Sequence, residues 1–242
     1  MKMDSQLTPS NREKTLNHIV DPEHEPFIEV YQAHLNELNT IVEKSGEEFE
    51  GSVFYNNRTA DFSQQLFPGY REKRRTLALL ANAFSSICEI GFNAGHSALL
   101  MLSSNPDLKL ASIDIGFHSY TLPCYEYLKS IFRDRIDLIL SNSLTAFPLL
   151  HNKFDYFDCY IIDGAHGLES AEADLLNCIS HTPRGTKILF DDADWKPPLP
   201  PLRAMISIYI AKGLLIPLLD PQGYLHNNNQ MLFINNKPAE FC

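Results

Sequence analysis

Three aspartates follow two apolar runs in the second half of the chain, where their carboxylates could bind a cation. Asp163 comes directly after residues 160–162, and Asp191 and Asp192 come directly after residues 187–190. If the two runs are neighbouring parallel strands, their ends lie about 4.8 Å apart, and carboxylates this close repel each other unless a cation or protons intervene. A hard cation with oxygen ligands, Mg²⁺ before Ca²⁺ or Mn²⁺, meets that requirement. We therefore predict a metal site at Asp163, Asp191 and Asp192, with separate helix caps as the alternative.

His166 lies three residues after Asp163 and could act as a general base. Most single histidines are structural or solvated, but this one shares a strand-end loop with the predicted metal site. An imidazole accepts a proton near neutral pH, which suits removal of a proton from a hydroxyl group. We therefore predict a catalytic role for His166.

A glycine-containing loop earlier in the chain predicts a nucleotide-type site. Residues 87–90 are mainly apolar, Gly91 and Gly95 follow, and an apolar segment at helical spacing begins at residue 96. Glycines let a ligand approach the backbone, and a helix start offers N–H groups to an anion. Asn93 stands at the middle position of a dinucleotide loop, and no Lys-Ser pair follows, so the loop does not match a phosphate cradle. A plain strand-to-helix turn is the alternative.

A ligand with an adenosine but no phosphates fits this loop, and S-adenosylmethionine is such a ligand. Its carboxylate would lie near the helix start after Gly95, and its ammonium group would lie near Glu89. Asp114 ends the second predicted strand, where an acid commonly accepts hydrogen bonds from ribose hydroxyls. A cap or turn is the alternative role for Asp114.

Asn142 and Ser143 follow the third predicted strand. A polar side chain here can meet the edge of an adenine, and it can equally cap the helix that follows. The sequence does not separate these two roles. His96, beside the glycine loop, either shapes the helix start or contacts the cofactor.

Apolar segments alternate with helical periodicity after residue 86, which is the pattern of a parallel sheet with helices on both faces. Such sheets bind ligands at the carboxyl ends of their strands, where the strand order reverses. The last two strands have no helix between them and should be antiparallel neighbours. The expected strands are 87–91, 109–114, 135–140, 157–163, 186–191, 214–218 and 230–234, and the expected helices among them are 96–104, 122–132, 143–150, 169–180 and 202–212.

Residues 1–69 are expected to form an N-terminal extension. Apolar residues recur at helical spacing over 22–45, which predicts an amphipathic helix that packs on the main domain or on a second copy of itself. Residues 55–67 are expected to form a flap over the site. A basic run then begins a second helix, 70–85, and we interpret this run as a solvated helix face, with an anion or substrate contact as the alternative. The run comprises Arg71, Lys73, Arg74 and Arg75.

The composition favours a globular domain that binds neither nucleic acid nor membrane. The chain has 242 residues, 44% of them hydrophobic, and a formal net charge of −10. No apolar run approaches the roughly 20 residues of a membrane span, and residues 1–17 lack the apolar core of a signal peptide, so we expect a cytoplasmic protein. Five cysteines without a CxxC pair indicate a reducing compartment and disfavour zinc.

Four segments carry a resemblance to a known family. They are Glu89-Ile-Gly-Phe-Asn-Ala-Gly95, Asp114, Ile162-Asp-Gly-Ala-His166 and Phe190-Asp-Asp192. Together they resemble the class I S-adenosylmethionine-dependent methyltransferases, and most of all the metal-dependent small-molecule O-methyltransferases of the catechol type and of the bacterial sugar and natural-product type. The resemblance covers about residues 70–236, and we place the methyltransferase domain at 70–242. It implies an α/β fold, with a Rossmann-like seven-stranded and mostly parallel sheet, an antiparallel last strand and helices on both faces.

The resemblance also implies roles for individual residues. His166 falls where the catechol-type enzymes have a catalytic lysine, so the general base is either His166 or Asp163. Asn142 stands where many relatives have an acid near the adenine. We add Asn93, His96, Asn142 and Ser143 to the cofactor site because they lie beside the loop or at a strand end. The resemblance itself implies that the cofactor is held by Glu89, Gly91, Gly95 and Asp114, and the metal by Asp163, Asp191 and Asp192.

We therefore expect O-methylation of a hydroxyl group on a small molecule, with S-adenosylmethionine and a divalent metal, Mg²⁺ first, as cofactors. A nucleotide-dependent oxidoreductase with a variant Rossmann loop and a non-catalytic methyltransferase-like binding module are the alternatives. Acceptor specificity is expected in residues 47–70, 195–201 and 219–229. A homodimer through the helix at 22–45 is also considered.

Overall fold

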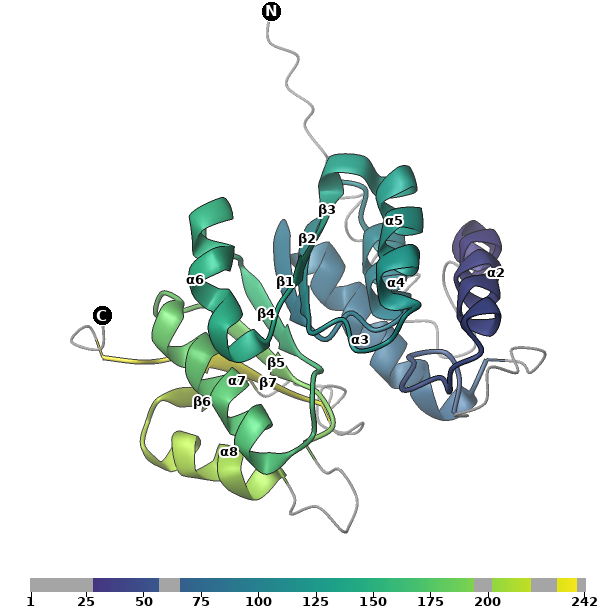
Figure 1. The fold of residues 1–242 in the computed structure, drawn as a ribbon. Helices are drawn as coiled ribbons and strands as arrows, with labels where there is room; N and C mark the ends of the chain where they lie inside the picture. Colours follow the sequence, from purple (N-terminus) through teal and green to yellow (C-terminus); the bar gives the residue numbers. More distant parts are fainter. Residues whose placement is uncertain (1–27, 57–65, 194–201, 219–229, 239–242) are drawn as a thin grey trace, which may run out of the picture.

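The computed structural model of the chain describes residues 28–56, 66–193, 202–218 and 230–238 (Figure 1). Several expectations concern residues outside these ranges. They are the start of the first helix at residue 22, residues 57–65 of the expected flap, and the segments 195–201 and 219–229.

A seven-stranded sheet forms the centre of the described part of the chain, in the order β3-β2-β1-β4-β5-β7-β6. Strand pairs from β3 to β5 are parallel, whereas β7 is antiparallel to both β5 and β6. This confirms the predicted fold class, including the antiparallel last strand. The strands are β1 (Ser86–Ile90), β2 (Lys109–Asp114), β3 (Ile136–Leu140), β4 (Cys159–Ile162), β5 (Lys187–Phe190), β6 (Leu215–Pro217) and β7 (Met231–Asn235).

The strand order reverses between β1 and β4, and the carboxyl ends of these strands are level. Ile90 of β1 pairs with Ile162 of β4, and Ile162 pairs with Phe190 of β5. The residues that follow, Gly91, Asp163 and Asp191, therefore leave the sheet side by side. This register places the glycine loop next to the predicted acid site.

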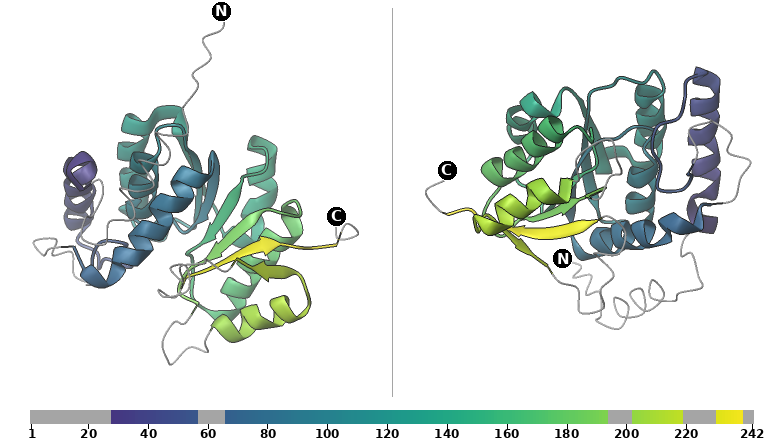
Figure 2. Two further views of the ribbon diagram at one scale, coloured as in Figure 1. Left: turned by 180° about the vertical axis from the view of Figure 1, so that it is seen from behind. Right: turned by 90° about the horizontal axis from the view of Figure 1, so that it is seen from below.

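Helices cover both faces of the sheet (Figures 1 and 2). Alternate residues of a strand face opposite sides, so Ile87 of β1 joins the core under one helical layer, and Cys88 joins the core under the other. One layer contains α2 (Ile28–Ser45), α3 (Arg71–Ala83), α4 (His96–Ser104) and α5 (Thr121–Phe132), and the other contains α6 (Ser143–Lys153), α7 (Leu168–His181) and α8 (Leu202–Ala211).

Helix α2 is amphipathic, as predicted, and it packs on the main domain. Its buried stripe consists of Tyr31, Leu35, Leu38 and Val42, which join the core shared with α4 and α5. Figure 2 shows α2 beside these helices in both views. Because the apolar stripe is covered within one chain, a homodimer through α2 would need another face of the helix, and dimerisation stays a prediction.

The basic run at the start of α3 is largely buried, so its interpretation as a solvated face is wrong. Arg74 and Arg75 are only 3% and 8% exposed. Nη1 of Arg74 donates hydrogen bonds to the carbonyl oxygens of Val53 (2.9 Å) and Phe67 (3.2 Å). The N–H of Phe67 also donates to the carbonyl oxygen of Phe54 at 2.7 Å. Arg74 therefore holds residues 53 and 67 against α3.

The thiol groups of Cys88 and Cys159 are free and buried, as predicted. None of the helices in the described ranges combines the length and the apolar character that crossing a membrane would require.

Candidate active site

The glycine loop runs from the end of β1 to the start of α4, and Gly91 brings it against the end of β4. Gly91 has φ +101°, and a Cβ built on it would lie 2.1 Å from the carbonyl oxygen of Asp163. Only glycine fits this contact. Asn93 also has a positive φ, of 52°, which asparagine tolerates better than most residues. The loop therefore has a fixed path that touches the predicted acid site.

Asp114 at the end of β2 holds the glycine loop, a role that the sequence analysis did not predict. Its Oδ2 accepts hydrogen bonds from the backbone N–H groups of Phe92 and Asn93, both at 2.8 Å, and its Oδ1 accepts one from Gly116 at 2.7 Å. A carboxylate oxygen can accept a second hydrogen bond, so contact with a ribose hydroxyl stays a prediction.

Glu89 is fully buried beneath the loop. Its carboxylate accepts hydrogen bonds from the hydroxyl groups of Ser97 in α4 and Ser112 in β2. Burial raises the pKa of Glu89 to about 7, and the two serine hydrogen bonds only partly oppose this shift. Glu89 thus ties β1, β2 and α4 together, and its direct contact with a ligand ammonium group stays a prediction.

Residues 47–56, which we call the N-terminal strap, cover the start of α4. His96 is buried there, with its Nδ1 3.0 Å from Oγ of Ser52 and its ring beside those of Phe49, Phe54 and Tyr55. Burial lowers the pKa of His96 to about 3, so its imidazole is neutral. His96 therefore shapes the helix start, which was one of its two predicted roles.

Asn93 joins the loop to the strap and to α5. Its Oδ1 accepts a hydrogen bond from the hydroxyl of Tyr120 at 2.7 Å, and its Nδ2 donates to the carbonyl oxygen of Gly51 at 3.4 Å. The sequence did not indicate that the N-terminal part would contribute to the loop. No local pattern in residues 47–56 carries that information.

Asn142 is the N-cap of α6, since its Oδ1 accepts a hydrogen bond from the N–H of Leu144 at 2.9 Å. Ser143 is the first residue of that helix and hydrogen-bonds Asp174 of α7. The capping role that the sequence allowed for Asn142 is thus confirmed, and an adenine contact stays a prediction.

Two large apolar side chains that sequence reasoning missed lie directly after Asp114. Ile115 is 66% exposed and Phe117 is 84% exposed. The sequence feature that could have indicated them is an apolar residue that directly follows an acid at the end of a strand.

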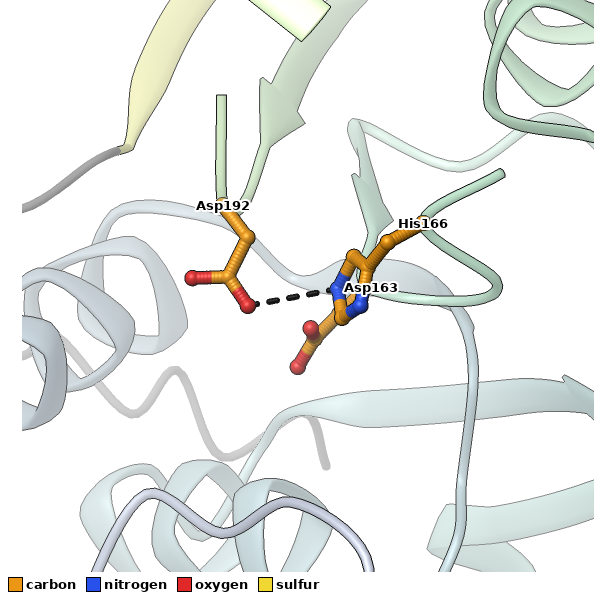
Figure 3. A group of neighbouring side chains, drawn as sticks. All are labelled: Asp163, His166 and Asp192. Carbon is orange, nitrogen blue, oxygen red and sulfur yellow. Dashed lines mark ion pairs between the residues drawn. The ribbon is translucent and has the colours of Figure 1, made fainter. Parts of the chain in front are cut away.

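The ends of β4 and β5 bring the predicted acid site together. Figure 3 shows Asp163, His166 and Asp192 converging from the two strand-end loops, with Nε2 of His166 3.2 Å from Oδ2 of Asp192. One ligand atom from each of these three residues lies within 4.8 Å of the others. Asp191 follows β5 directly and is 3% exposed.

Lys73 of α3 supplies a cation to this acid site, and sequence reasoning missed that role. Its Nζ lies 2.8 Å from Oδ2 of Asp191 and 3.0 Å from Oδ1 of Asp192. The only pointer in the sequence was the basic run of α3, for which an anion contact was the alternative interpretation.

A family model described as a methyltransferase domain matches residues 88–193, the range that holds the glycine loop and all three aspartates. Residues 88–193 are therefore similar to a methyltransferase domain. No curated protein sequence matches the chain.

Solved structures of methyltransferases share the fold of this domain. An O-methyltransferase from Bacillus cereus in complex with SAH is 14% identical, with a TM-score of 0.57 over 94% of this chain and 97% of that chain. A putative O-methyltransferase from Klebsiella pneumoniae is 15% identical, with a TM-score of 0.56 over 94% and 97%. An SAH-bound methyltransferase from Podospora anserina is 17% identical, with a TM-score of 0.52 over 71% and 83%. At these identities the similarity establishes the fold alone.

The charges at the acid site of the methyltransferase domain depend on one another. Burial and the neighbouring carboxylate of Asp191 raise the pKa of Asp163 well above its usual range, and Lys73 opposes this shift. Burial acts to raise the pKa of Asp192 as well, but the contacts with His166 and Lys73 outweigh it and lower the pKa to about 2. Burial acts to lower the pKa of Lys73, but the surrounding carboxylates raise it above its usual value. The contacts with Lys73 and His166 thus stabilise the charged form of Asp192, whereas burial and the carboxylate of Asp191 disfavour the charged form of Asp163.

The backbone at Asp192 is held in a rarely populated conformation. Its φ is 53°, and its N–H donates a hydrogen bond to Oδ1 of Asp191 at 2.9 Å. A positive φ in a residue with a Cβ costs about 1 to 3 kcal/mol and is common at functional sites. This turn directs the two neighbouring carboxylates toward the same ammonium group.

A divalent metal at the predicted ligands Asp163, Asp191 and Asp192 stays a prediction: ligand atoms of Asp163, His166 and Asp192 lie close enough to hold an ion, but Lys73 already pairs with two of the aspartates. Lys73 takes one oxygen of Asp191 and one of Asp192, and His166 faces the second oxygen of Asp192. An added divalent cation would have to displace the lysine or bear its repulsion at close range.

Proposed function

We propose that this protein transfers a methyl group from S-adenosylmethionine to a hydroxyl oxygen of a small molecule. The observation that carries the proposal is the contact between Gly91 and Asp163, which places a loop suited to the cofactor directly beside a buried acid site. Solved structures with this fold include an O-methyltransferase in complex with SAH and another, from Streptomyces achromogenes, in complex with SAM.

The donor groups around the glycine loop suit an adenosine that bears no phosphates. None of the described side chains caps the start of α4, which suits the carboxylate of the cofactor, and Oδ1 of Asp114 accepts one hydrogen bond and keeps a lone pair for a ribose hydroxyl. Ile115 offers an exposed apolar side chain beside Asp114, which suits the face of an adenine. When bound, S-adenosylmethionine supplies an electrophilic methyl group on a positively charged sulfur, and the electron pair of the broken bond stays with that sulfur.

His166 is our candidate for the group that removes the hydroxyl proton of the acceptor. Its Nε2 faces the carboxylate of Asp192, so a proton on Nε2 is stabilised and Nδ1 becomes the nitrogen that accepts the substrate proton. Asp163 is the other candidate base, and burial together with the carboxylate of Asp191 raises its pKa, so that its charged form is disfavoured in the free protein. The acceptor oxygen then forms its bond to the methyl carbon, and proximity to the glycine loop provides much of the acceleration.

The proposal does not include Mg²⁺, because Lys73 already neutralises the acid pair at the end of β5. It does include a small-molecule acceptor rather than nucleic acid, since a chain with a formal net charge of −10 attracts a polyanion poorly.

The proposal is tested by measuring formation of S-adenosylhomocysteine with a panel of hydroxylated small molecules. In His166→Ala the turnover should fall about 100-fold or more, and the pH–rate profile should lose one ionisation. An active His166→Ala with an unchanged profile would remove the histidine from this role.

Cofactor binding is tested separately by thermal unfolding. The melting temperature should rise with S-adenosylhomocysteine and not with NAD, because a ligand that binds only the folded state raises its stability. A larger shift with NAD would favour the oxidoreductase instead.

A further inference from the structure

The ammonium group of Lys73 lies at the point where the three aspartates of the site converge. It contacts Oδ2 of Asp191 at 2.8 Å and Oδ1 of Asp192 at 3.0 Å. The Lys73 side chain is only 11% exposed, so these contacts are shielded from water and from salt. The carboxylates that suggested a divalent cation in the sequence therefore already share a cation that belongs to the chain.

The lysine is held in place by a buried helix rather than by a flexible surface segment. Helix α3 packs into the core through Leu77 and Leu80 and contacts α4. The ammonium group also lies 5.6 Å from the centre of the Tyr70 ring, a favourable cation–π distance. Displacing Lys73 would leave a buried ammonium group without its carboxylate partners, which is strongly unfavourable.

We infer that Lys73 is the resident cation of this acid site and takes the place of a divalent metal, so that methyl transfer by this protein needs no metal. This inference rests on the proposed function and adds a positioning residue to it. Lys73 fixes the orientation of Asp191 and Asp192, and Asp192 in turn orients His166. The positive charge also favours an acceptor oxygen that becomes negative as its proton leaves.

The competing possibility is that Lys73 is a placeholder that Mg²⁺ displaces. The two possibilities differ in what the lysine does to metal affinity. A resident cation excludes the metal, so the metal should bind only after the ammonium group is removed. If Lys73 is a placeholder, the metal should bind to the wild-type protein and displace its ammonium group.

The experiment measures Mn²⁺ binding by electron paramagnetic resonance in the wild-type protein, Lys73→Met and Lys73→Arg, without acceptor. Lys153→Met is the matched control, because Lys153 also pairs with an aspartate, Asp137 at 2.9 Å, but on the exposed surface. We expect no Mn²⁺ site in the wild type, Lys73→Arg or Lys153→Met. Lys73→Met should show a Mn²⁺ site whose affinity is at least about tenfold above any residual binding by the wild type, a change of the size that groups around metal ligands produce.

Turnover supplies the second readout. The wild-type rate should be unchanged in EDTA, and Lys73→Met should lose about 100-fold in kcat with little change in KM for the cofactor. Lys73→Arg should recover part of that loss. A merely structural lysine would change stability without creating a Mn²⁺ site.

Stoichiometric Mn²⁺ binding by the wild-type protein, or loss of its turnover in EDTA, would overturn the inference whether or not Lys73→Met folds. Equal Mn²⁺ affinities in the wild type and a folded Lys73→Met would also overturn it. The Mn²⁺ measurements need no acceptor and no S-adenosylmethionine. Failure of the proposed methyl transfer would therefore be seen separately, as absent turnover and an absent thermal shift with S-adenosylhomocysteine.

Discussion

The glycine-loop side of the site and the acid side differ in how each satisfies its carboxylates. On the loop side, Glu89 is bonded by two serine hydroxyls and Asp114 by three backbone N–H groups. On the acid side, Asp191 and Asp192 share a full positive charge from Lys73. The first arrangement uses residues of β1, β2, the glycine loop and α4, and the partners are at most 23 positions apart. The second depends on a helix that precedes the sheet, so it is the more sensitive to single changes.

Gly91→Ala would break the contact between the two sides and should have the largest effect. The added Cβ would lie 2.1 Å from the carbonyl oxygen of Asp163, so the free energy of unfolding should fall by about 4 kcal/mol. Gly185→Ala is the control, because Gly185 has a similar φ of +97° but nothing within 4 Å, and it should cost only about 1 to 2 kcal/mol. Urea unfolding measures both values. Equal losses would show that the two sides are not in close contact.

Asp191→Asn tests the acid side alone. It leaves the buried ammonium of Lys73 with one carboxylate fewer, and the free energy of unfolding should fall by about 3 kcal/mol. Asp137→Asn removes a more exposed partner of Lys153 and should cost less than about 1 kcal/mol. If urea unfolding gave similar losses for both variants, the acid pair would not be held by its lysine as described.

The pH dependence of stability should differ in sign between Glu89 on the loop side and Asp192 on the acid side. The pKa of Glu89 is raised from 4.5 to about 7, so the folded state binds the extra proton, and stability should fall as the pH rises through that range. The pKa of Asp192 is lowered to about 2, so its contribution should be lost only as the pH falls toward 2. Glu89→Gln should flatten the decline between pH 4.5 and 7, by about 1 to 3 kcal/mol in total. A wild-type stability that rises over this range would contradict the assignment.

Asn142→Ala should have the smallest effect, because it removes a single cap at the exposed start of α6. The expected loss is about 1 kcal/mol in the free energy of unfolding, and Asn142→Ser should retain most of the cap. If Asn142 also contacts the cofactor, Asn142→Ala should weaken S-adenosylhomocysteine binding more than Asn142→Ser does, which calorimetry would show.

Local patterns in the sequence were sufficient for most elements of the sheet and its helices. The helix expected at 96–104 is α4 (His96–Ser104), and the strand expected at 109–114 is β2 (Lys109–Asp114). Such elements are determined by residues close together in the sequence, namely the glycines between elements and the spacing of the apolar residues. The placement of Asp163 beside Asp191 was also predictable, because adjacent parallel strands end at the same edge of a sheet.

Side-chain partners that lie far apart in the sequence could not be predicted in the same way. Lys73 and Asp192 are separated by 119 positions, and nothing near Lys73 distinguishes a buried ion pair from a solvated lysine. The contact between Ser52 and His96 is another example, because it depends on how the N-terminal strap crosses the start of α4. Tertiary packing, rather than local propensity, determines both.

Arg74 has a consequence for how much the chain between residues 53 and 67 can vary in length. Its guanidinium holds the carbonyl groups of residues 53 and 67, and the backbones of Phe54 and Phe67 are hydrogen-bonded to each other. The two ends of the intervening segment are thus anchored to α3 independently of its own sequence. Doubling the length of such a closed segment costs only about 0.6 kcal/mol in chain entropy. We therefore expect that a change in the number of residues between positions 54 and 67 costs little stability, while α3 keeps Lys73 in place.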